Sequence, residues 1–256
     1  MPTRHDRDAG GDPAVLAAKA ALREQVWAAM AVPGVRRFPS PDGRIPNFVG
    51  AEAAAVRLAG TEAWQQARTL KANPDSPQLP VRRRALEDGK TVFMAVPRLA
   101  DPHPFFRLDP DHLVDPPRTA ASIAGASRSA QRVAVEDLDP VELVVTGCVA
   151  AGRDGARLGK GGGFSDLELA LAAAAGLVDE RTVVVTTVHQ VQVVEGGAIP
   201  TTSHDIHVDL IATPDSVITC PRPRGHRLPE LDWDQLTEDK IAAIPLLARL
   251  AASRDS

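Results

Sequence analysis

The sequence predicts an α/β fold with a mostly parallel sheet, and three observations support this prediction. Short apolar segments rich in β-branched residues recur along the chain, as strands buried on both faces of a sheet require. Segments with apolar residues at helical spacing alternate with them. Hydrophobic residues make up 44% of the 256 residues, enough to bury a substantial core. We expect a single domain over residues 14–250, a flexible N-terminal tail at 1–13 and a C-terminal tail at 251–256.

Helices are predicted where apolar side chains recur every three or four residues. The first runs from Val15 to Met30 and stops before Pro33 and Gly34, which do not continue a helix. A second is expected from Ala51 to Leu70. The remaining two are predicted at residues 167–175, ending at Gly176, and at residues 234–250, with an interruption at Pro245.

Strands are predicted at residues 91–96, 143–146, 182–188, 208–212 and 216–218. The segment Thr182-Val-Val-Val-Thr-Thr-Val188 is apolar or β-branched throughout, which favours a central strand. Closely spaced prolines predict a loop without regular structure at residues 72–80. The proline-rich residues 101–117 are expected to form a long surface excursion.

Composition excludes several classes of function. The net charge is −4 and basic residues are not gathered into a run, so nucleic-acid binding is not expected. No segment approaches the roughly 18 apolar residues that a membrane span needs. Cys148 and Cys220 lie far apart and outside any C-x-x-C motif, which indicates reduced thiols and no zinc site. The N-terminus lacks the apolar core of a signal peptide. We therefore expect a soluble, cytoplasmic protein.

A glycine-rich segment, Arg157-Leu-Gly-Lys-Gly-Gly-Gly-Phe-Ser-Asp166, is the strongest functional signal. It lies between a predicted strand and the helix predicted to begin at Leu167. Its glycines, at 159 and 161–163, allow backbone N–H groups to approach an anion, and the helix N-terminus adds its positive dipole end. Arg157 and Lys160 add positive charge, and Asp166 is a candidate magnesium ligand. The pattern predicts a nucleotide phosphate site.

Two better-known phosphate loops do not fit this segment. Gly161 stands where a Walker A loop has Ser or Thr after its Lys, and the spacing of the dinucleotide motif G-x-G-x-x-G is absent. The alternative is a flexible surface loop in which Asp166 is an ordinary helix N-cap.

Lys19 and Arg23 lie four residues apart on the first predicted helix, so both side chains leave the same face. Their like charges repel, and an anion between them would remove that cost. The alternative is a solvated helix face.

The segment 204–209 gathers His204, Asp205, His207 and Asp209. On a strand, Asp205, His207 and Asp209 would share one face. Alternate residues of one strand seldom complete a metal site, so we expect no dedicated metal centre and select Asp205 as the functional candidate. His189 follows a buried strand, at the sheet edge where α/β proteins usually bind ligands, although a structural histidine fits equally well. Hydrolase elbows and H-E-x-x-H motifs are absent.

These motifs together resemble a known family. The segment 157–166 resembles the R-L-G-x-G-x-G-[YF]-Y-D loop of 5-formyltetrahydrofolate cyclo-ligases, also called methenyltetrahydrofolate synthetases. Lys19-Ala-Ala-Leu-Arg23 is similar to the N-terminal K-x-x-L-R of that family, and residues 204–214 are similar to its D-x-x-V-D-x-x-x-T segment. The resemblance covers residues 18–250, with the three motifs in the family's order.

The resemblance implies a Rossmann-like three-layer α/β/α fold of the NagB/RpiA/CoA-transferase type. It also implies a ligase that uses Mg-ATP to convert 5-formyltetrahydrofolate to 5,10-methenyltetrahydrofolate, ADP and phosphate. In this family the phosphates would be clamped by Lys19, Arg23, Arg157 and Lys160 and cradled by Gly159, Gly161, Gly162 and Gly163. Phe164 would pack near the nucleotide and Asp166 would reach Mg. We select Arg157, Lys160 and Asp205 as candidate catalytic residues.

This chain departs from the family pattern near the second substrate. Ser165 replaces a Tyr, Leu167 stands where the family often has Arg, and the family's acidic substrate-binding position falls near Gln78. The chain contains no Tyr.

The pattern is more similar to a paralogous branch, the methenyltetrahydrofolate-synthetase-domain-containing proteins, which has been associated with thiamin metabolism. The branch motifs occur at residues 159–168, 44–48 (R-I-P-N-F), 71–75 (K-x-N-P-D) and 244–247 (I-P-L-L). Three hypotheses follow: a folate cyclo-ligase, a paralogue with a non-folate substrate, and a non-catalytic ATP-binding protein. Each would be a monomer or a small homo-oligomer.

Overall fold

The computed structural model describes residues 12–96, 99, 101–202, 205–222, 230, 231, 233 and 236–254, apart from the side chain of Phe164. The helices are α1 (Pro13–Met30), α2 (Ala51–Ala59), α3 (Glu62–Gln66), α4 (Leu79–Glu87), α5 (Pro117–Ala120), α6 (Ile123–Ser129), α7 (Phe164–Ala174), α8 (Glu238–Ala243) and α9 (Pro245–Arg254). The strands are β1 (Thr69–Ala72), β2 (Thr91–Ala95), β3 (Phe105–Leu108), β4 (Gln131–Val133), β5 (Leu143–Thr146), β6 (Ala150–Gly152), β7 (Arg157–Leu158), β8 (Val183–Thr187), β9 (Val193–Val194), β10 (Leu210–Ala212) and β11 (Val217–Thr219).

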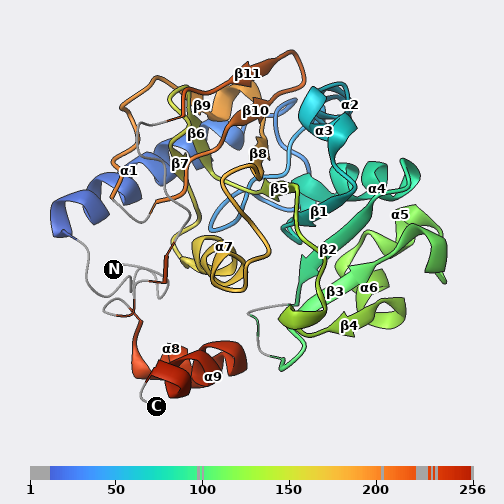
Figure 1. Cartoon of the computed structure of the whole chain (residues 1–256). Coiled ribbons are helices and arrows are strands. Elements are labelled where there is room, and N and C mark those ends of the chain that lie inside the picture. Colours follow the sequence, from blue (N-terminus) through green and yellow to red (C-terminus); the bar gives the residue numbers. More distant parts are fainter. Residues whose placement is uncertain are drawn as a thin grey trace.

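Within the described residues, eight strands form one sheet in the order β11-β10-β8-β5-β1-β2-β3-β4 (Figure 1). The strands β10, β8, β5, β1 and β2 are parallel to their neighbours in this series. Antiparallel strands, β11 at one edge and β3 with β4 at the other, complete it. The predicted α/β fold with a mostly parallel sheet is confirmed.

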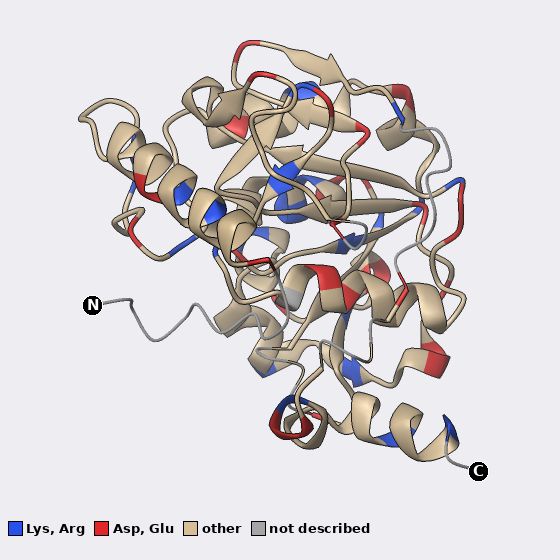
Figure 2. Cartoon of the chain, turned by 90° about the vertical axis from the view of Figure 1, so that its left-hand side faces the viewer, with Lys and Arg blue, Asp and Glu red and all other residues tan. Residues whose placement is uncertain are grey.

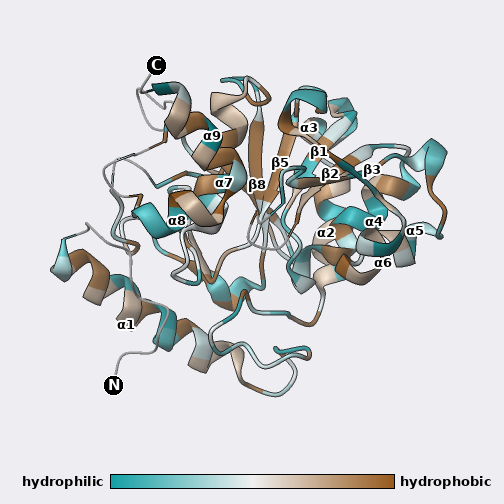
Figure 3. Ribbon diagram, turned by 90° about the horizontal axis from the view of Figure 1, so that it is seen from below, coloured by the Kyte–Doolittle hydropathy of each residue, from teal (hydrophilic) through white to brown (hydrophobic). Residues whose placement is uncertain are grey.

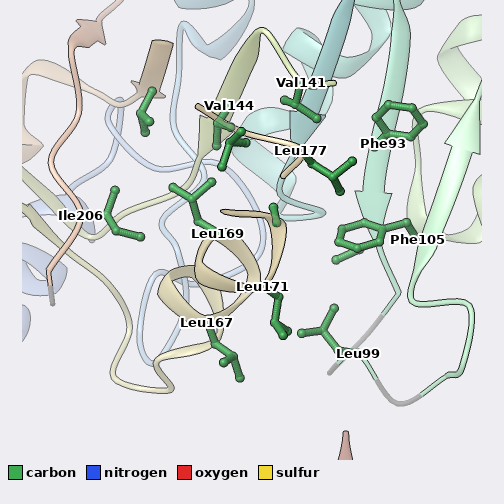
Figure 4. Packing of buried hydrophobic residues seen from close by; sticks show 14 of the residues in the cluster. Phe93, Leu99, Phe105, Val141, Val144, Leu167, Leu169, Leu171, Leu177 and Ile206 are labelled. Carbon is green, nitrogen blue, oxygen red and sulfur yellow. The ribbon is translucent and has the colours of Figure 1, made fainter. Parts of the chain in front are cut away.

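Helices cover both faces of this sheet, so the molecule has three layers (Figure 3). On β2, Phe93 and Ala95 join the core on the α7 side, whereas Val92 and Met94 join the core on the α2 and α4 side. This alternation is the period-two pattern of a strand buried on both faces. On the α7 side, Leu167, Leu169 and Leu171 of α7 belong to the same buried cluster as Phe93 and Val144, and Figure 4 shows Leu169 pointing toward Val144.

A second, three-stranded sheet lies beside the main one and carries α1. Its order is β7-β6-β9, with β6 and β7 antiparallel and β6 and β9 parallel. Val26, Trp27 and Met30 of α1 form a separate core with Ala150 and Leu158 of this sheet. Figure 1 shows α1 running alongside β6 and β7. The small sheet was not predicted, because strands of two or three residues leave no periodic pattern to recognise.

The helix predicted from Ala51 to Leu70 is wrong in its second half. Residues 51–59 form α2, but the chain turns at Gly60, and Thr61 accepts a hydrogen bond from the Trp64 N–H to begin the short α3. Residues 69–72 then form β1, in the middle of the sheet. Burial of Leu70 and Ala72 between parallel neighbours therefore overrides the helical spacing that continued from α2.

The proline-rich segments are more regular than predicted. Within residues 72–80, Ala72 ends β1, Ser76–Gln78 form a 3₁₀ turn, and α4 begins at Leu79 with Pro80 in its first turn, where a missing N–H costs no helical bond. Residues 101–117 are not a surface excursion throughout, because residues 105–108 form β3. Phe105 and Phe106 are each 1% exposed there.

The other predicted elements are confirmed with shifted bounds. The helix after the glycine loop begins at Phe164 and ends before Gly176, which adopts a positive φ of 71°. The strand predicted at 208–212 begins only at Leu210, and the closing helix divides before Pro245 and continues to Arg254. Residues 1–11 of the predicted tail, His204 and Asp234 lie outside the described residues. Among the helices of the described chain, none is long and apolar enough to cross a membrane.

Candidate functional site

The glycine loop leads from β7 of the small sheet into α7 beneath the main sheet. Arg157 and Leu158 form β7, residues 159–163 form the loop, and α7 follows without a break. Gly161 and Gly163 have φ values of 103° and 64°, a region that only glycine adopts without strain. The helix N-cap is Gly163, so the alternative in which Asp166 caps α7 is wrong. The N-terminus of an 11-residue helix therefore faces the loop.

Arg157 is the most buried of the four predicted cations. Its side chain is 3% exposed, and its guanidinium donates to the Asp166 carboxylate in the first turn of α7. The Nε of Arg157 has no hydrogen-bond partner among the described residues. A buried guanidinium with an unused donor has capacity for a further acceptor, which a phosphate oxygen would provide.

Lys19 and Arg23 point from α1 toward the segments that carry the loop and Asp205. The Lys19 ammonium lies 2.9 and 2.7 Å from the two carboxylate oxygens of Asp205. The Arg23 side chain is buried, and its Nε donates to the carbonyl oxygen of Gly159 at 2.8 Å. Figure 2 colours the basic positions along α1. The alternative of a solvated helix face is therefore wrong for both residues, since both make specific contacts with distant segments.

Lys160 lies in the loop itself and is the most accessible of the four cations. Its side chain is 48% exposed, and its ammonium is 3.8 Å from a carboxylate oxygen of Asp75. The structure thus brings Lys19, Arg23, Arg157 and Lys160 to one region, where Asp205, Asp166 and Asp75 balance three of the charges. An incoming polyanion would add a further partner for these cations beside the carboxylates.

The carboxyl ends of β1 and β5 form the side of the site beyond the loop. A Cβ placed on Gly147, just after β5, would lie 2.9 Å from Gln78 Oε1 and 3.2 Å from an Asp75 carboxylate oxygen. A side chain at this position would require its neighbours, Gln78 first, to shift. The Gln78 side chain is fully buried and its amide faces the Thr187 oxygens at 3.3 and 3.4 Å, whereas Oε1 has no partner within the described chain. Two acceptor oxygens therefore converge above Gly147.

In the segment 204–209, Asp205 and Asp209 are engaged in ion pairs. Asp205 also accepts from the backbone N–H and hydroxyl of Thr202, and Asp209 is committed to the Val184 N–H and to Arg222 at 2.5 Å. In the part of the chain that is described, no three His, Cys, Asp or Glu residues are placed to hold a metal ion. Residues 205–209 precede β10 instead of lying in it. His204 falls outside the described residues.

Asp166 remains the candidate for a magnesium ion that arrives with a nucleotide. Its carboxylate is 37% exposed and borders the loop. Mg²⁺ bound to phosphates keeps several waters and needs one or two protein carboxylates, so a single Asp fits that mode of binding.

His189 has a structural environment. Its Nδ1 accepts the Val191 N–H, and Phe48 packs edge-on against the ring with 6.1 Å between centroids. Burial lowers the pKa of His189, an effect that Asp215 partly opposes, so the ring is neutral at neutral pH. His189 therefore adds no positive charge to the site.

Both cysteines should be unreactive in the folded protein. Burial raises the pKa of Cys148 and of Cys220 from 9.0 to about 11, and thiolate is the reactive form. Iodoacetamide at pH 8 should label neither residue until denaturant unfolds the chain. Because the folded-state pKa is raised, the stabilising contribution of each thiol is complete below pH 9 and is lost as the pH rises toward 11. Rapid labelling of native protein would contradict this burial.

Substitution of Gly159 by alanine tests the loop without disturbing the fold. A Cβ at Gly159 meets no atom within 4 Å, and its φ is not positive, so unfolding in urea should be unchanged. An anion held by the backbone would meet the new methyl group, and we expect Mg-ATP to bind about tenfold more weakly. Equal affinity of the variant and the wild type, measured by isothermal titration, would show that no ligand approaches this backbone.

The residues that sequence reasoning missed come from the 71–75 segment. Lys71, Asn73 and Asp75 contact Glu168, Ser165 and Lys160 respectively. The only signal for them was the branch motif K-x-N-P-D, because contacts between β1 and α7 join positions almost one hundred residues apart.

Comparisons with known proteins identify related sequences and a related structure. Residues 15–214 match the sequence profile of the 5-formyltetrahydrofolate cyclo-ligase family. The chain is 37% identical over 243 residues to the methenyltetrahydrofolate synthase domain-containing protein of Mus musculus, a match that covers 91% of this chain and 63% of that protein. The protein of the same name from Bos taurus is 36% identical over 250 residues, covering 93% of this chain and 63% of its own length. The chain thus spans 63% of the length of these relatives.

A solved structure shares the fold. The NMR structure of 5,10-methenyltetrahydrofolate synthetase from Aquifex aeolicus superimposes with a TM-score of 0.51 at 19% identity. The superposition covers 82% of this chain and 96% of that protein.

Proposed function

Because the chain belongs to the 5-formyltetrahydrofolate cyclo-ligase family, we propose that it is an ATP-dependent ligase that binds Mg-ATP at the glycine loop. The proposed reaction converts 5-formyltetrahydrofolate and ATP to 5,10-methenyltetrahydrofolate, ADP and phosphate. The observation that carries the proposal is that Arg23, Arg157 and Lys160 gather at the glycine loop before α7, with Arg157 buried and with Lys19 one turn from Arg23 on α1. A triphosphate carries several negative charges and acceptor oxygens, which suit a helix N-terminus and a cluster of cations.

The chain's own contribution would be positioning and charge neutralisation, which phosphoryl transfer mainly requires. Arg157 and the loop backbone would orient the phosphates, and Lys160 would neutralise charge on the transferred phosphoryl group. The formyl oxygen would accept the γ-phosphoryl group as ADP leaves. The neighbouring amine nitrogen of the folate would then attack the formyl carbon and lose its proton, and phosphate would leave with the formyl oxygen. Asp205 would hold Lys19 in the orientation that the phosphates need.

Formation of the methenyl product provides the test. Its absorbance should rise when 5-formyltetrahydrofolate is added to the protein with Mg-ATP, and it should not rise without ATP. A flat trace from protein that binds Mg-ATP would exclude the folate reaction and leave the ATP site standing.

A paralogue acting on a non-folate substrate is the second candidate, and Ser165 supports it. The Ser165 hydroxyl accepts a hydrogen bond from the Asn73 amide at 2.7 Å. The position at which the family has a Tyr near its second substrate is therefore occupied here by a residue that makes an internal contact. Gln78 presents a neutral amide oxygen where an acidic group would be expected. ATP-dependent phosphate release with a formamide or amine substrate other than folate would favour this candidate. Such release would also exclude a non-catalytic ATP-binding protein. The cytoplasmic location and the oligomeric state remain predictions.

A further inference from the structure

Three side-chain pairs join the end of β1 to the glycine loop and to the start of α7. The pairs are Lys71 with Glu168 at 2.5 Å, Asn73 with Ser165 at 2.7 Å, and Asp75 with Lys160 at 3.8 Å. We call these six residues the β1–α7 contact group. Residues 71, 73 and 75 alternate along the chain, and residues 165 and 168 are one helical turn apart. The spacing of each segment therefore suits the other.

The β1–α7 contact group is buried at one end and exposed to solvent at the other. The side chains of Lys71 and Glu168 are 3% and 10% exposed, whereas those of Asp75 and Lys160 are 21% and 48% exposed. The two more buried pairs are also linked to each other, because the Lys71 ammonium donates to the Asn73 side-chain oxygen at 3.2 Å. The two more buried pairs are therefore a fixed part of the core, and the Asp75–Lys160 pair lies at the candidate phosphate site.

A buried ion pair is weak evidence for stability, because apolar residues of similar volume often serve as well. A pair fixed by hydrogen bonds does, however, impose one geometry on the elements that it joins. Here the joined elements are β1, in the centre of the sheet, and the first two turns of α7. Ser165 and Asp166 are consecutive in the first of these turns, and Asp166 accepts from Arg157.

We propose that Lys71 and Asn73 are positioning residues for nucleotide binding. Through their contacts with Glu168 and Ser165, these two residues fix the position of the start of α7. That position in turn determines where the glycine loop and the Arg157–Asp166 pair lie. The inference rests on the proposed Mg-ATP site. It adds that this site depends on a residue of β1, Lys71, and on Asn73 just after β1, neither of which contacts the phosphates.

A double variant that removes the buried charge pair separates positioning from stability. In Lys71→Met with Glu168→Leu, apolar side chains fill the space, and the urea midpoint should return to that of the wild type after falling in Lys71→Met alone. The affinity for Mg-ATP, measured by isothermal titration on the full chain, should stay about tenfold weaker. Recovery of stability without recovery of affinity is a result that a merely structural pair would not give.

Asn73→Ala is a second variant that keeps the inner ion pair, and it should also bind Mg-ATP about tenfold more weakly. The matched control is Arg249→Met with Glu136→Leu, which removes an exposed ion pair between α9 and the 3₁₀ turn at residues 135–137 and should leave affinity unchanged. Folded variants of residues 71, 73 and 168 that bind Mg-ATP as tightly as the wild type would overturn the positioning role and leave the proposed function intact. A wild type that binds no Mg-ATP would instead refute the proposed function, and the positioning role with it.

Discussion

Replacing Arg157 by alanine should weaken Mg-ATP binding by about 30-fold to 1,000-fold, the loss expected when one member of a buried, hydrogen-bonded charge pair is removed at a binding site. The Arg157 side chain is 3% exposed and sits beneath the glycine loop with an unused Nε donor. Water screens a buried guanidinium poorly, so its attraction for phosphate is larger than that of a surface cation. Isothermal titration of Mg-ATP into the wild type and the variant measures the effect.

Arg153→Ala is the matched control for this prediction. Arg153 lies in the turn between β6 and β7, close in sequence to Arg157, but its side chain is 54% exposed and faces Glu195 at 3.8 Å. We expect its removal to change the affinity by less than about twofold. Equal effects of the two substitutions would mean that net charge, and not the buried position, governs binding.

Replacing Arg82 by alanine should lower the free energy of unfolding by about 3–5 kcal/mol, because the substitution breaks a buried network of charged hydrogen bonds. Arg82 is 1% exposed. Its guanidinium donates to the carbonyl oxygens of Asn73, Pro74, Asp75 and Ala121. Burial lowers the pKa of Arg82 to about 10, an effect that Asp75 partly opposes, so the group is charged at neutral pH. Urea unfolding followed by circular dichroism measures the loss.

The neighbouring Arg84 provides the control on the same helix. Its side chain is 41% exposed and pairs with Asp88 one turn later at 2.8 Å. An exposed pair of this kind contributes about 0.3–0.5 kcal/mol, so Arg84→Ala should be nearly neutral. A loss for Arg82→Ala as small as that for Arg84→Ala would contradict the role of Arg82 in holding residues 73–75.

The sequence predicts strands with an unbroken run of apolar or β-branched residues better than the other strands, whether they lie inside the sheet or at its edge. Strands β5 and β8 are buried on both faces, and their unbroken β-branched composition reveals them directly. The first two residues of β1 fall within the helix predicted to end at Leu70, and only the place of the strand between β5 and β2 determines its conformation. The strand β3 was hidden by flanking prolines, although Phe105 and Phe106 are buried.

The candidate site was predicted only in part, because the sequence shows local patterns but not contacts between distant segments. The glycine loop and the pair Lys19 and Arg23 are local patterns, so the sequence alone reveals them as candidates. The charge balance is not local: Asp205 lies 186 residues from Lys19, and Glu168 lies 97 residues from Lys71. No periodicity joins positions so far apart, and only the fold brings these carboxylates to the cations.

Titration of the wild-type protein with Mg-ATP, Mg-ADP and AMP tests the central claim, that the glycine loop holds the nucleotide phosphates, most directly. We expect saturable binding of one Mg-ATP per chain, weaker binding of Mg-ADP, and at least tenfold weaker binding of AMP, since each lost phosphate removes partners of the clustered cations. The absence of Mg-ATP binding, or equal affinity for AMP and Mg-ATP, would contradict the phosphate site.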